Sequence, residues 1–296
     1  MPFTGEFSAL LTALLWSASS IIFAEATQRI GSVQLNINRL FVAALLLIIT
    51  IFIGGIPYEL SFKQLLFLSV SGIIGLTIGD TFLFKAYQHI GARFSMLLMA
   101  LSPGMTAILG YFFLSERISL LGIFGMIITL GGIALVILER QETPTSKYKI
   151  SRIGIIYGVL GALGQAGGLI FAKLAFNEGE IHGFVATFIR IASSIFVLFP
   201  ILLMARRFKN PIKLYKNDLK SLGLTIAGSI VGPYFGITFS LIAIVHTKVG
   251  IAATLMSTMP IIMLPMIKYV YKEKLTYRSI TGAVIAVVGI AILFLR

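Results

Sequence analysis

Long apolar stretches recur along the chain and are separated by short polar connections. Ten of them reach about 20 residues, the length that an α-helix needs to cross the hydrocarbon core of a bilayer. Lipid offers no partner for backbone amides and carbonyls, so each stretch is expected to be helical. The stretches lack the two-residue alternation of membrane β-strands, which excludes a β-barrel. The predicted spans are 7–27, 33–54, 63–88, 91–113, 119–138, 152–176, 181–205, 219–243, 247–271 and 276–295.

Two polar connections stand out from the pattern. The first, ERQETPTSKYKIS at 139–151, lies near the middle of the chain, and the second, RRFKNPIKLYKNDLK at 206–220, contains six basic residues. We interpret the first as the boundary between two halves, which gives domains 1–140 and 152–296 with a linker at 141–151. The first apolar stretch has no basic segment before it, so we expect a retained span rather than a cleaved signal peptide.

The two halves are related by an internal repeat. Displaced by 157 positions, the chain aligns with itself without a gap from the third span to the fifth, and Pro103 falls on Pro260. The first two spans align less cleanly, with Arg39 facing Arg190 at an offset of 151. Other matches at the offset of 157 are Lys63 with Lys220, Gly75 with Gly232, Gly79 with Gly236, His89 with His246, Glu116 with Glu273, Gly125 with Gly282 and Gly132 with Gly289.

An odd number of spans in each half has a consequence for topology. Five crossings leave the chain on the opposite side, so the second half enters the membrane upside down. Inverted repeats around a midplane site are a recurring architecture of secondary transporters. The predicted fold is therefore an all-α membrane protein in which ten transmembrane helices form two inverted five-helix repeats around a central cavity.

The segment from Gly79 to Ser119 resembles the EamA-type repeat of the drug/metabolite transporter superfamily. Pro103 matches the proline in the fourth span of that repeat, and LSERIS at 114–119 matches its turn before the fifth span. In the second half, KEKLT at 272–276 lacks the leucine and has lysine for arginine, so this copy matches less well. The resemblance implies a ten-span carrier with a central cavity that exports or exchanges small metabolites, often amino acids or their analogues.

Composition narrows the function classes. Charged residues make up 12% of the chain, against about 25% in a typical soluble domain. The net charge of +13 resides mostly in connections, as is typical of membrane proteins, so no nucleic-acid partner is expected. The chain has no cysteine, which excludes disulfides and thiolate metal sites. It also lacks HExxH, Walker A and nucleophile-elbow motifs, so we expect no catalytic residues, metal or cofactor.

Charged side chains inside the spans are the most informative residues, because each costs about 2.5–3.5 kcal/mol on insertion scales unless it is paired or hydrated. Arg39, Asp80 and Arg190 lie about two turns or more from the nearer span end, so we expect them to line an aqueous cavity or to pair across it. If Lys268 is left out, the charges inside the spans comprise four cations (Arg39, Lys85, Lys173 and Arg190) and two acids (Glu25 and Asp80). This excess of cations favours a solute that bears a carboxylate or phosphate, the groups that arginine holds well. Residues nearer the span ends are expected to reach the interface: Glu25, Lys85, Lys173 and Lys268.

Several residues are candidates for particular roles in transport. A desolvated carboxylate can exchange protons near neutral pH, so we consider Asp80 for proton coupling, together with Glu25. Pro103 and Pro260, in the middle of their spans, are candidate gate elements or simple packing kinks. Candidate cavity contacts with polar or aromatic side chains are Trp16, Ser17, Gln165, Tyr234 and Thr238.

The sequence thus predicts a multi-pass secondary transporter of the plasma (cell) membrane, an exporter or exchanger that works by alternating access. Its partners are a small-molecule solute and the lipid bilayer. A membrane-embedded enzyme and a non-transporting membrane scaffold are the alternatives. Glycines at four-residue spacing serve packing within a monomer or dimerisation, which leaves both monomer and homodimer open. The charge bias places the termini outside the cytoplasm, whereas the resemblance implies the cytoplasmic side.

Overall fold

The computed structural model describes residues 3–138, 151–216, 218–259, 261–262, 266 and 277–294, and within these ranges all regular structure is helical. Six helical runs are long and apolar enough to cross a membrane: Thr4–Ile30, Ser32–Ile53, Phe62–Ile90, Arg152–Asn177, Gly183–Met204 and Leu219–His246. The predicted all-α membrane class is therefore confirmed. The helices are α1 (Thr4–Ile30), α2 (Ser32–Ile53), α3 (Phe62–Gly72), η1 (Ile73–Gly79), α4 (Asp80–Met99), α5 (Ser102–Leu114), α6 (Leu120–Leu138), α7 (Arg152–Asn177), α8 (Gly183–Met204), α9 (Pro211–Lys216), α10 (Leu219–Ser229), η2 (Ile230–Gly236), α11 (Ile237–His246), α12 (Val249–Met256) and α14 (Tyr277–Phe294).

Local signals in the sequence set the helix ends. Ser61 and Gln64 form a capping box at the start of α3, in which each side chain satisfies a backbone amide that the first turn leaves unpaired. The side chain of Ser151 accepts from the amide of Gly154 at the start of α7. Gly31 separates α1 from α2 with a φ of 87°, a left-handed value that suits glycine.

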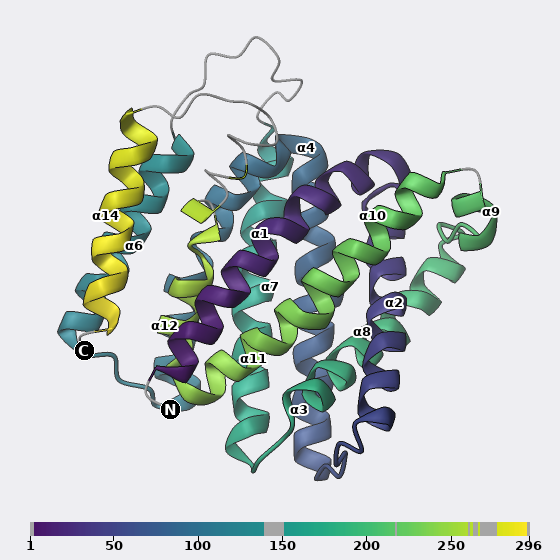
Figure 1. Cartoon of the computed structure of the whole chain (residues 1–296), viewed down its shortest axis with the longest axis horizontal. Coiled ribbons are helices and arrows are strands. Elements are labelled where there is room, and N and C mark those ends of the chain that lie inside the picture. Colours follow the sequence, from purple (N-terminus) through teal and green to yellow (C-terminus); the bar gives the residue numbers. More distant parts are fainter. Residues whose placement is uncertain are drawn as a thin grey trace.

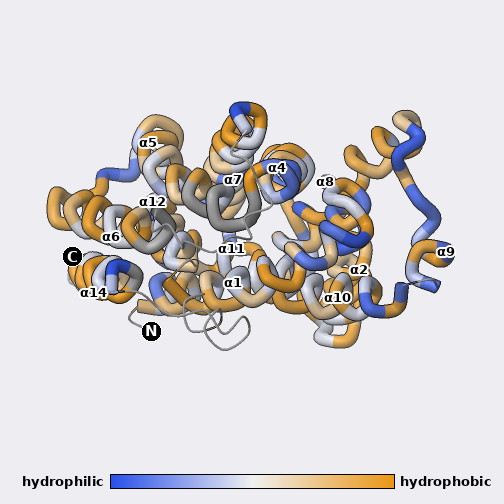
Figure 2. Tube along the Cα trace, turned by 90° about the horizontal axis from the view of Figure 1, so that it is seen from above, coloured by the Kyte–Doolittle hydropathy of each residue, from blue (hydrophilic) through white to orange (hydrophobic). Residues whose placement is uncertain are grey.

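The outer surface of the bundle is apolar. Large hydrophobic side chains such as Phe52, Phe112, Leu120 and Phe196 are exposed, and Figure 2 shows apolar residues along most of the helices, with hydrophilic stretches in connections such as the one around α9. A water-soluble monomer rarely exposes large contiguous apolar patches. The outward-facing side chains therefore suit contact with lipid.

The internal repeat is visible in the helix boundaries. α2 and α8 differ by 151 positions at both ends, and the π-helices η1 and η2 differ by 157 positions at both ends. Each π-helix is closed by an amide that donates to a carbonyl five residues earlier, from Asp80 to Gly75 and from Ile237 to Gly232. Single π turns inside α-helices are frequent at functional sites.

The helices pack in two layers, and the first helix of each half of the chain packs with helices of the other half. α1 lies along α10, η2 and α11 and also contacts α12, whereas α7 packs against α3, η1, α4 and α5. We call the first group layer A and the second layer B; Figure 1 shows α1 and α10 running diagonally across the more vertical helices of layer B. Each layer thus combines helices from both halves of the chain, so the packed units differ from the sequence halves.

Two helix pairs complete the bundle at its edges. α6 packs against α14 at one edge, and α2 packs against α8 at the other. α2 also contacts α10 and η2, which makes it an extension of layer A, and α8 contacts α3 and η1, which makes it an extension of layer B.

The boundary between the third and fourth predicted spans differs from the prediction. α4 continues from Asp80 to Met99, through residues 89–90 where the two spans were expected to meet, and the break comes at residues 100–101. Pro103 accounts for this position, because it has no amide to donate to the carbonyl of Met99 four residues earlier, so α4 cannot continue past that point, whereas proline is tolerated in the first turn of α5. Residues 89–90 contain no such helix breaker.

Candidate functional site

A cavity of about 130 Å³ lies between layers A and B. This volume is large enough for several water molecules. Both repeats contribute to its wall, mostly with apolar side chains. The lining residues are Trp16, Ser19, Ser20, Phe23, Arg39, Leu76, Asp80, Leu83, Phe84, Tyr87, Met99, Ala100, Ser102, Gln165, Leu169, Arg190, Gly232, Pro233, Ile237, Ser240, Ala253, Met256, Ser257 and Met259.

Two equivalent helix ends face this cavity. α4 ends at Met99 and α12 ends at Met256, which lie 157 positions apart, and both methionines line the cavity. Pro103 lies next to the lining residue Ser102 and is itself buried. The proline thus marks a complete break between two helices rather than a kink within one. Pro260, its partner in the repeat, lies outside the described residues.

A buried ion pair joins the two layers across the cavity. The guanidinium of Arg39 on α2 donates to Asp80 Oδ2 at the start of α4, and the two side chains are 7% and 15% exposed. Arg39 Nε and Nη2 also donate to Asn36 Oδ1, at 3.1 and 3.0 Å. The ring of Phe84 lies 4.8 Å from the guanidinium carbon, within the range of a cation–π contact. Protein groups therefore engage Arg39 at Nε, at Nη2 and at the face of its guanidinium.

Arg190 occupies the equivalent position in the second repeat but has different surroundings. It lines the cavity from α8, is 2% exposed, and its Nε has no hydrogen-bond partner among the described residues. The repeat offsets place Ile237 at the position of Asp80 and Thr187 at the position of Asn36. An unsatisfied buried donor costs about 1–3 kcal/mol, and more for a charged group. The second repeat thus keeps the arginine without the carboxylate.

The backbone of layer B packs closely around Arg190. A Cβ atom on Gly72 would lie 2.0 Å from the carbonyl oxygen of Arg190, and one on Gly75 would lie 3.2 Å from its Nη2. Only glycine fits at Gly72 without displacing backbone. The glycines of α3 and η1 therefore let α8 approach and bring the guanidinium to the cavity wall.

The other predicted contact residues divide into two groups. Trp16 and Gln165 line the cavity. Ser17, Tyr234 and Thr238 lie outside the lining, where their hydroxyl groups join helices. The hydroxyl of Ser17 donates to the carbonyls of Ala13 and Met259 at 2.6 and 3.1 Å. Tyr234 shares a 2.6 Å hydrogen bond with the hydroxyl of Thr50 on α2, and Thr238 shares a 3.1 Å hydrogen bond with the hydroxyl of Thr187 on α8.

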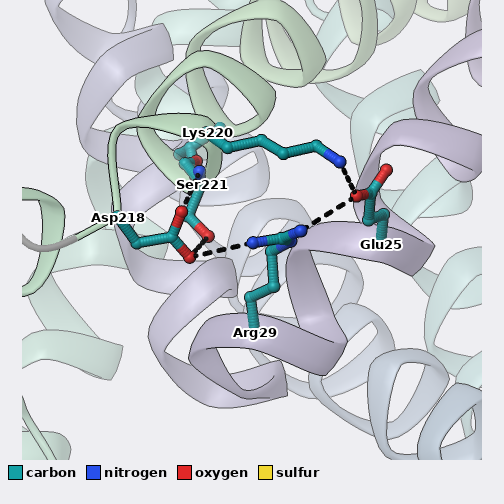
Figure 3. Close-up of polar contacts among 6 residues, drawn as sticks. Glu25, Arg29, Asp218, Lys220 and Ser221 are labelled. Atoms are coloured by element: carbon teal, nitrogen blue, oxygen red, sulfur yellow. Dashed lines mark hydrogen bonds and ion pairs between the residues drawn. The ribbon is translucent and has the colours of Figure 1, made fainter.

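Glu25 lies away from the cavity, in a charged cluster that joins the end of α1 to the start of α10 (Figure 3). Its carboxylate pairs with Lys220 and with Arg29, and Arg29 also reaches Asp218 at 3.3 Å. The Ser221 hydroxyl and amide donate to Asp218, which, together with Arg29, holds the pKa of this carboxyl below its usual value. The carboxyl group of Asp218 therefore remains ionised at neutral pH. With Glu25 at the surface, the proposal of proton coupling depends on Asp80.

The remaining charges in the spans also have local partners. The ammonium group of Lys85 lies 5.3 Å from the centre of the Tyr157 ring. Lys173 Nζ donates to the carbonyl of Ile244 and, at 3.3 Å, to that of Val245, which are carbonyls left open at the C-terminus of α11. Lys268 lies outside the described residues. Within the described ranges, no group of three or more histidine, aspartate or glutamate side chains could hold a metal ion.

Sequence reasoning missed Pro233 and the two methionines at the helix ends. Pro233 lies inside η2 and lines the cavity. Its position was visible as a proline one residue after Gly232, which is a matched glycine of the repeat. Met99 and Met256 were also detectable, since the offset of 157 aligns them four residues before Pro103 and Pro260.

Apolar helices in two inverted copies, with a cavity and a buried ion pair between their layers, define a membrane protein of the transporter class. Comparison with known proteins agrees with this class. The model of the EamA-like transporter family matches residues 3–138 and 152–295, so the chain belongs to the EamA-like transporter family. This is a family of multi-pass membrane transporters and not of enzymes.

Individual relatives are distant. The chain is 26% identical over 125 residues to the "Uncharacterized transporter YxxF" of Bacillus subtilis (strain 168), and the match spans 42% of this chain and 39% of that protein. A solved structure, titled "Crystal structure of protein", superposes with a TM-score of 0.75 at 15% identity and covers 99% of this chain and 96% of its own. At that identity the likeness establishes the fold alone.

Proposed function

We propose that this chain is a secondary transporter of the cell membrane that moves small carboxylate- or phosphate-bearing metabolites, amino acids among them, by alternating access. The observation that carries the proposal is the cavity between layers A and B, whose wall includes Arg39, Asp80 and Arg190. Charges this deep in a membrane protein are expensive and typically mark a transport pathway. Their net positive charge favours an anionic group on the solute.

The packing suggests which parts move. Layers A and B each combine helices from both halves, so the rocking units of this transporter are the layers rather than residues 1–140 and 152–296, the two repeats that we propose to be joined by the linker 141–151. The Arg39–Asp80 pair connects the layers. Movement of one layer against the other would separate these side chains, and a proton on Asp80 would lower the cost of that separation.

Counterflow in proteoliposomes tests the proposal. Vesicles preloaded with an unlabelled amino acid or organic acid are diluted into the labelled compound, and the compound is expected to accumulate transiently above the level of protein-free vesicles. An exporter and an exchanger both give this signal, because counterflow requires no net gradient. The proposal would be wrong if cationic solutes accumulated faster than anionic and zwitterionic ones, or if no solute of the panel exchanged.

A further inference from the structure

The two repeats differ in how they neutralise their equivalent arginines. Arg39 has Asp80 and Asn36 as partners, whereas the corresponding positions around Arg190 hold Ile237 and Thr187. The Thr187 hydroxyl is engaged elsewhere, since it donates to the carbonyl of Gly183 at 2.8 Å and shares a 3.1 Å hydrogen bond with Thr238. The internal duplication therefore supplies its own comparison: Arg39 is hydrogen-bonded to a carboxylate, whereas Arg190 has Asp80 only as a more distant charge and no carboxylate of the described residues hydrogen-bonded to it.

We infer that Arg190 is the anchor for the anionic group of the solute, so that the bound solute takes the place that Asp80 has in the first repeat. Arg190 is 2% exposed, lines the cavity, and its Nε lacks a partner among the described residues. A buried arginine in this condition gains strongly from a carboxylate or phosphate, because its planar fork matches their oxygens. The inference rests on the proposed transport function and names the group of the solute that the cavity selects.

The rest of the cavity wall defines the other end of the solute. Trp16, Phe23 and Phe84 contribute aromatic rings, and Met99 and Met256 contribute flexible thioether side chains at the two helix ends. Such a wall favours an apolar body, and methionine adapts to bodies of different shape. The ligand chemistry is thus one anionic head on an apolar body of modest size.

Asp80 limits which anions fit. Its carboxylate lines the same cavity, but it is held by the guanidinium of Arg39. A head group that approached Arg39 would have to displace Asp80, whereas one that approached Arg190 Nε would displace no hydrogen-bond partner among the described residues. The asymmetry therefore directs the anion to the α8 side of the cavity.

Four probes with the same ring and different heads test the assignment: phenylacetate, phenyl phosphate, 2-phenylethanol and 2-phenylethylamine. Binding to the purified protein is measured by the rise of its unfolding midpoint with ligand concentration, because a ligand stabilises the state that it binds. Phenylacetate or phenyl phosphate is expected to bind the unmodified chain about tenfold or more tightly than the alcohol, as a charge-assisted hydrogen bond predicts. The comparison of the two anions distinguishes a carboxylate site from a phosphate site.

Two substitutions test whether Arg190 is the source of the preference for anionic probes. Arg190→Met removes the cation, and Ile237→Asp places in the second repeat the carboxylate that the first repeat has, so that Arg190 gains an internal partner. Both are expected to abolish the preference for anions over 2-phenylethanol. Ile237→Asn is the matched control, since it changes polarity without charge and should keep the preference. If Arg190→Met does not fold, Ile237→Asp still tests the inference. It retains Arg190, and pairing this buried charge is expected to raise the unfolding midpoint.

The outcomes separate this inference from the proposed function. Equal binding of all four probes to the unmodified chain, or an anion preference that survives in both Arg190→Met and Ile237→Asp, would overturn the role of Arg190 even if counterflow is robust. A preference that disappears in both variants, in a chain that shows no counterflow, would support the anion site and refute transport.

Discussion

Gly79 and Gly164 touch backbone to backbone where η1 crosses α7. A Cβ atom on Gly164 would lie 2.6 Å from the Cα of Gly79, and one on Gly168 would lie 3.0 Å from the Cα of Gly75. Each helix thus presents glycines at four-residue spacing to the other, an arrangement that allows close approach of membrane helices. Gly236, which matches Gly79 in the second repeat, packs against the side chain of Trp16 rather than against the backbone of a neighbouring helix. These glycine faces are used for packing within the monomer.

Substitution of the glycine contact should therefore be costly. Gly164→Ala would force two backbones apart, and overpacking of this kind is expected to lower the free energy of unfolding by about 1–3 kcal/mol. The measurement is the unfolding midpoint of the purified protein. Gly223→Ala in α10 is the matched control, because an added Cβ meets no atom within 4 Å; it is expected to raise stability by about 0.5–1 kcal/mol through helix propensity. A similar change in both variants would show that the contact is not tight.

The ion pairs at the ends of the bundle should matter much less than the pair inside it. Lys63 Nζ lies 3.4 Å from Glu178 Oε2, and Lys220 Nζ lies 2.5 Å from Glu25 Oε1, with all four side chains substantially exposed. Each pair joins two helices of one layer, so neither has to break when the layers move. Exposed pairs contribute about 0–1 kcal/mol. Lys63→Met and Lys220→Met are therefore expected to keep near-normal unfolding midpoints and counterflow rates.

Arg39→Met provides the comparison for these two variants. It would leave the buried carboxylate of Asp80 without its cation, and breaking a buried pair costs about 3–5 kcal/mol. We expect a clearly lower unfolding midpoint for Arg39→Met under the same conditions. Equal destabilisation by Lys220→Met and Arg39→Met would contradict the assignment of Arg39–Asp80 as the buried link between the layers.

The repeat allowed much of the fold to be predicted. The offset of 157, found from glycines and prolines, relates the two π-helices and the two helix ends at Met99 and Met256. Arg39, Asp80 and Arg190 could be singled out because a charge deep in an apolar span is costly wherever the span packs. Glu25 lies close to the end of its span and was expected to reach the interface, and its carboxylate is exposed in a pair with Lys220.

Other features could not be predicted because they depend on contacts between helices. Hydropathy gives the length of a span but not its neighbours, so the packing of α1 against α10 and α11 was not visible in the sequence. A π turn differs from an α turn by one residue in its hydrogen bonds, and its composition is not distinctive. Tyr234 and Thr238 were selected for polarity alone, and polarity did not reveal that Thr50 would satisfy Tyr234.

The family turn between α5 and α6 has a structural explanation that mutation can test. Glu116 Oε2 accepts from the amide of Val249 at 2.8 Å, at the start of α12, where the N-cap residue Lys248 supplies no side-chain cap. A carboxylate at a helix N-terminus satisfies an open amide and interacts favourably with the helix dipole. Glu116→Ala is expected to lower the free energy of unfolding by about 1–2 kcal/mol, and Glu116→Gln by less. Unchanged unfolding midpoints in both Glu116 variants would show that the contact of this turn with α12 does not stabilise the protein.

Asp80 is the residue on which proton coupling can be decided. Protonation of its carboxyl removes the charge that holds Arg39, so binding of a proton should release the link between layers A and B. The proton should leave Asp80 when the link reforms. Asp80→Asn imitates the released state permanently. We expect this variant to retain counterflow, which needs no driving ion, and to lose accumulation driven by a pH gradient, which for one proton per solute is limited to about tenfold per pH unit. Glu25→Gln is the control, because Glu25 lies outside the cavity, and its response to the gradient should match that of the unmodified protein. Gradient-driven accumulation that persists in Asp80→Asn would mean that the ion pair serves the structure of the cavity and that the driving ion, if there is one, binds elsewhere.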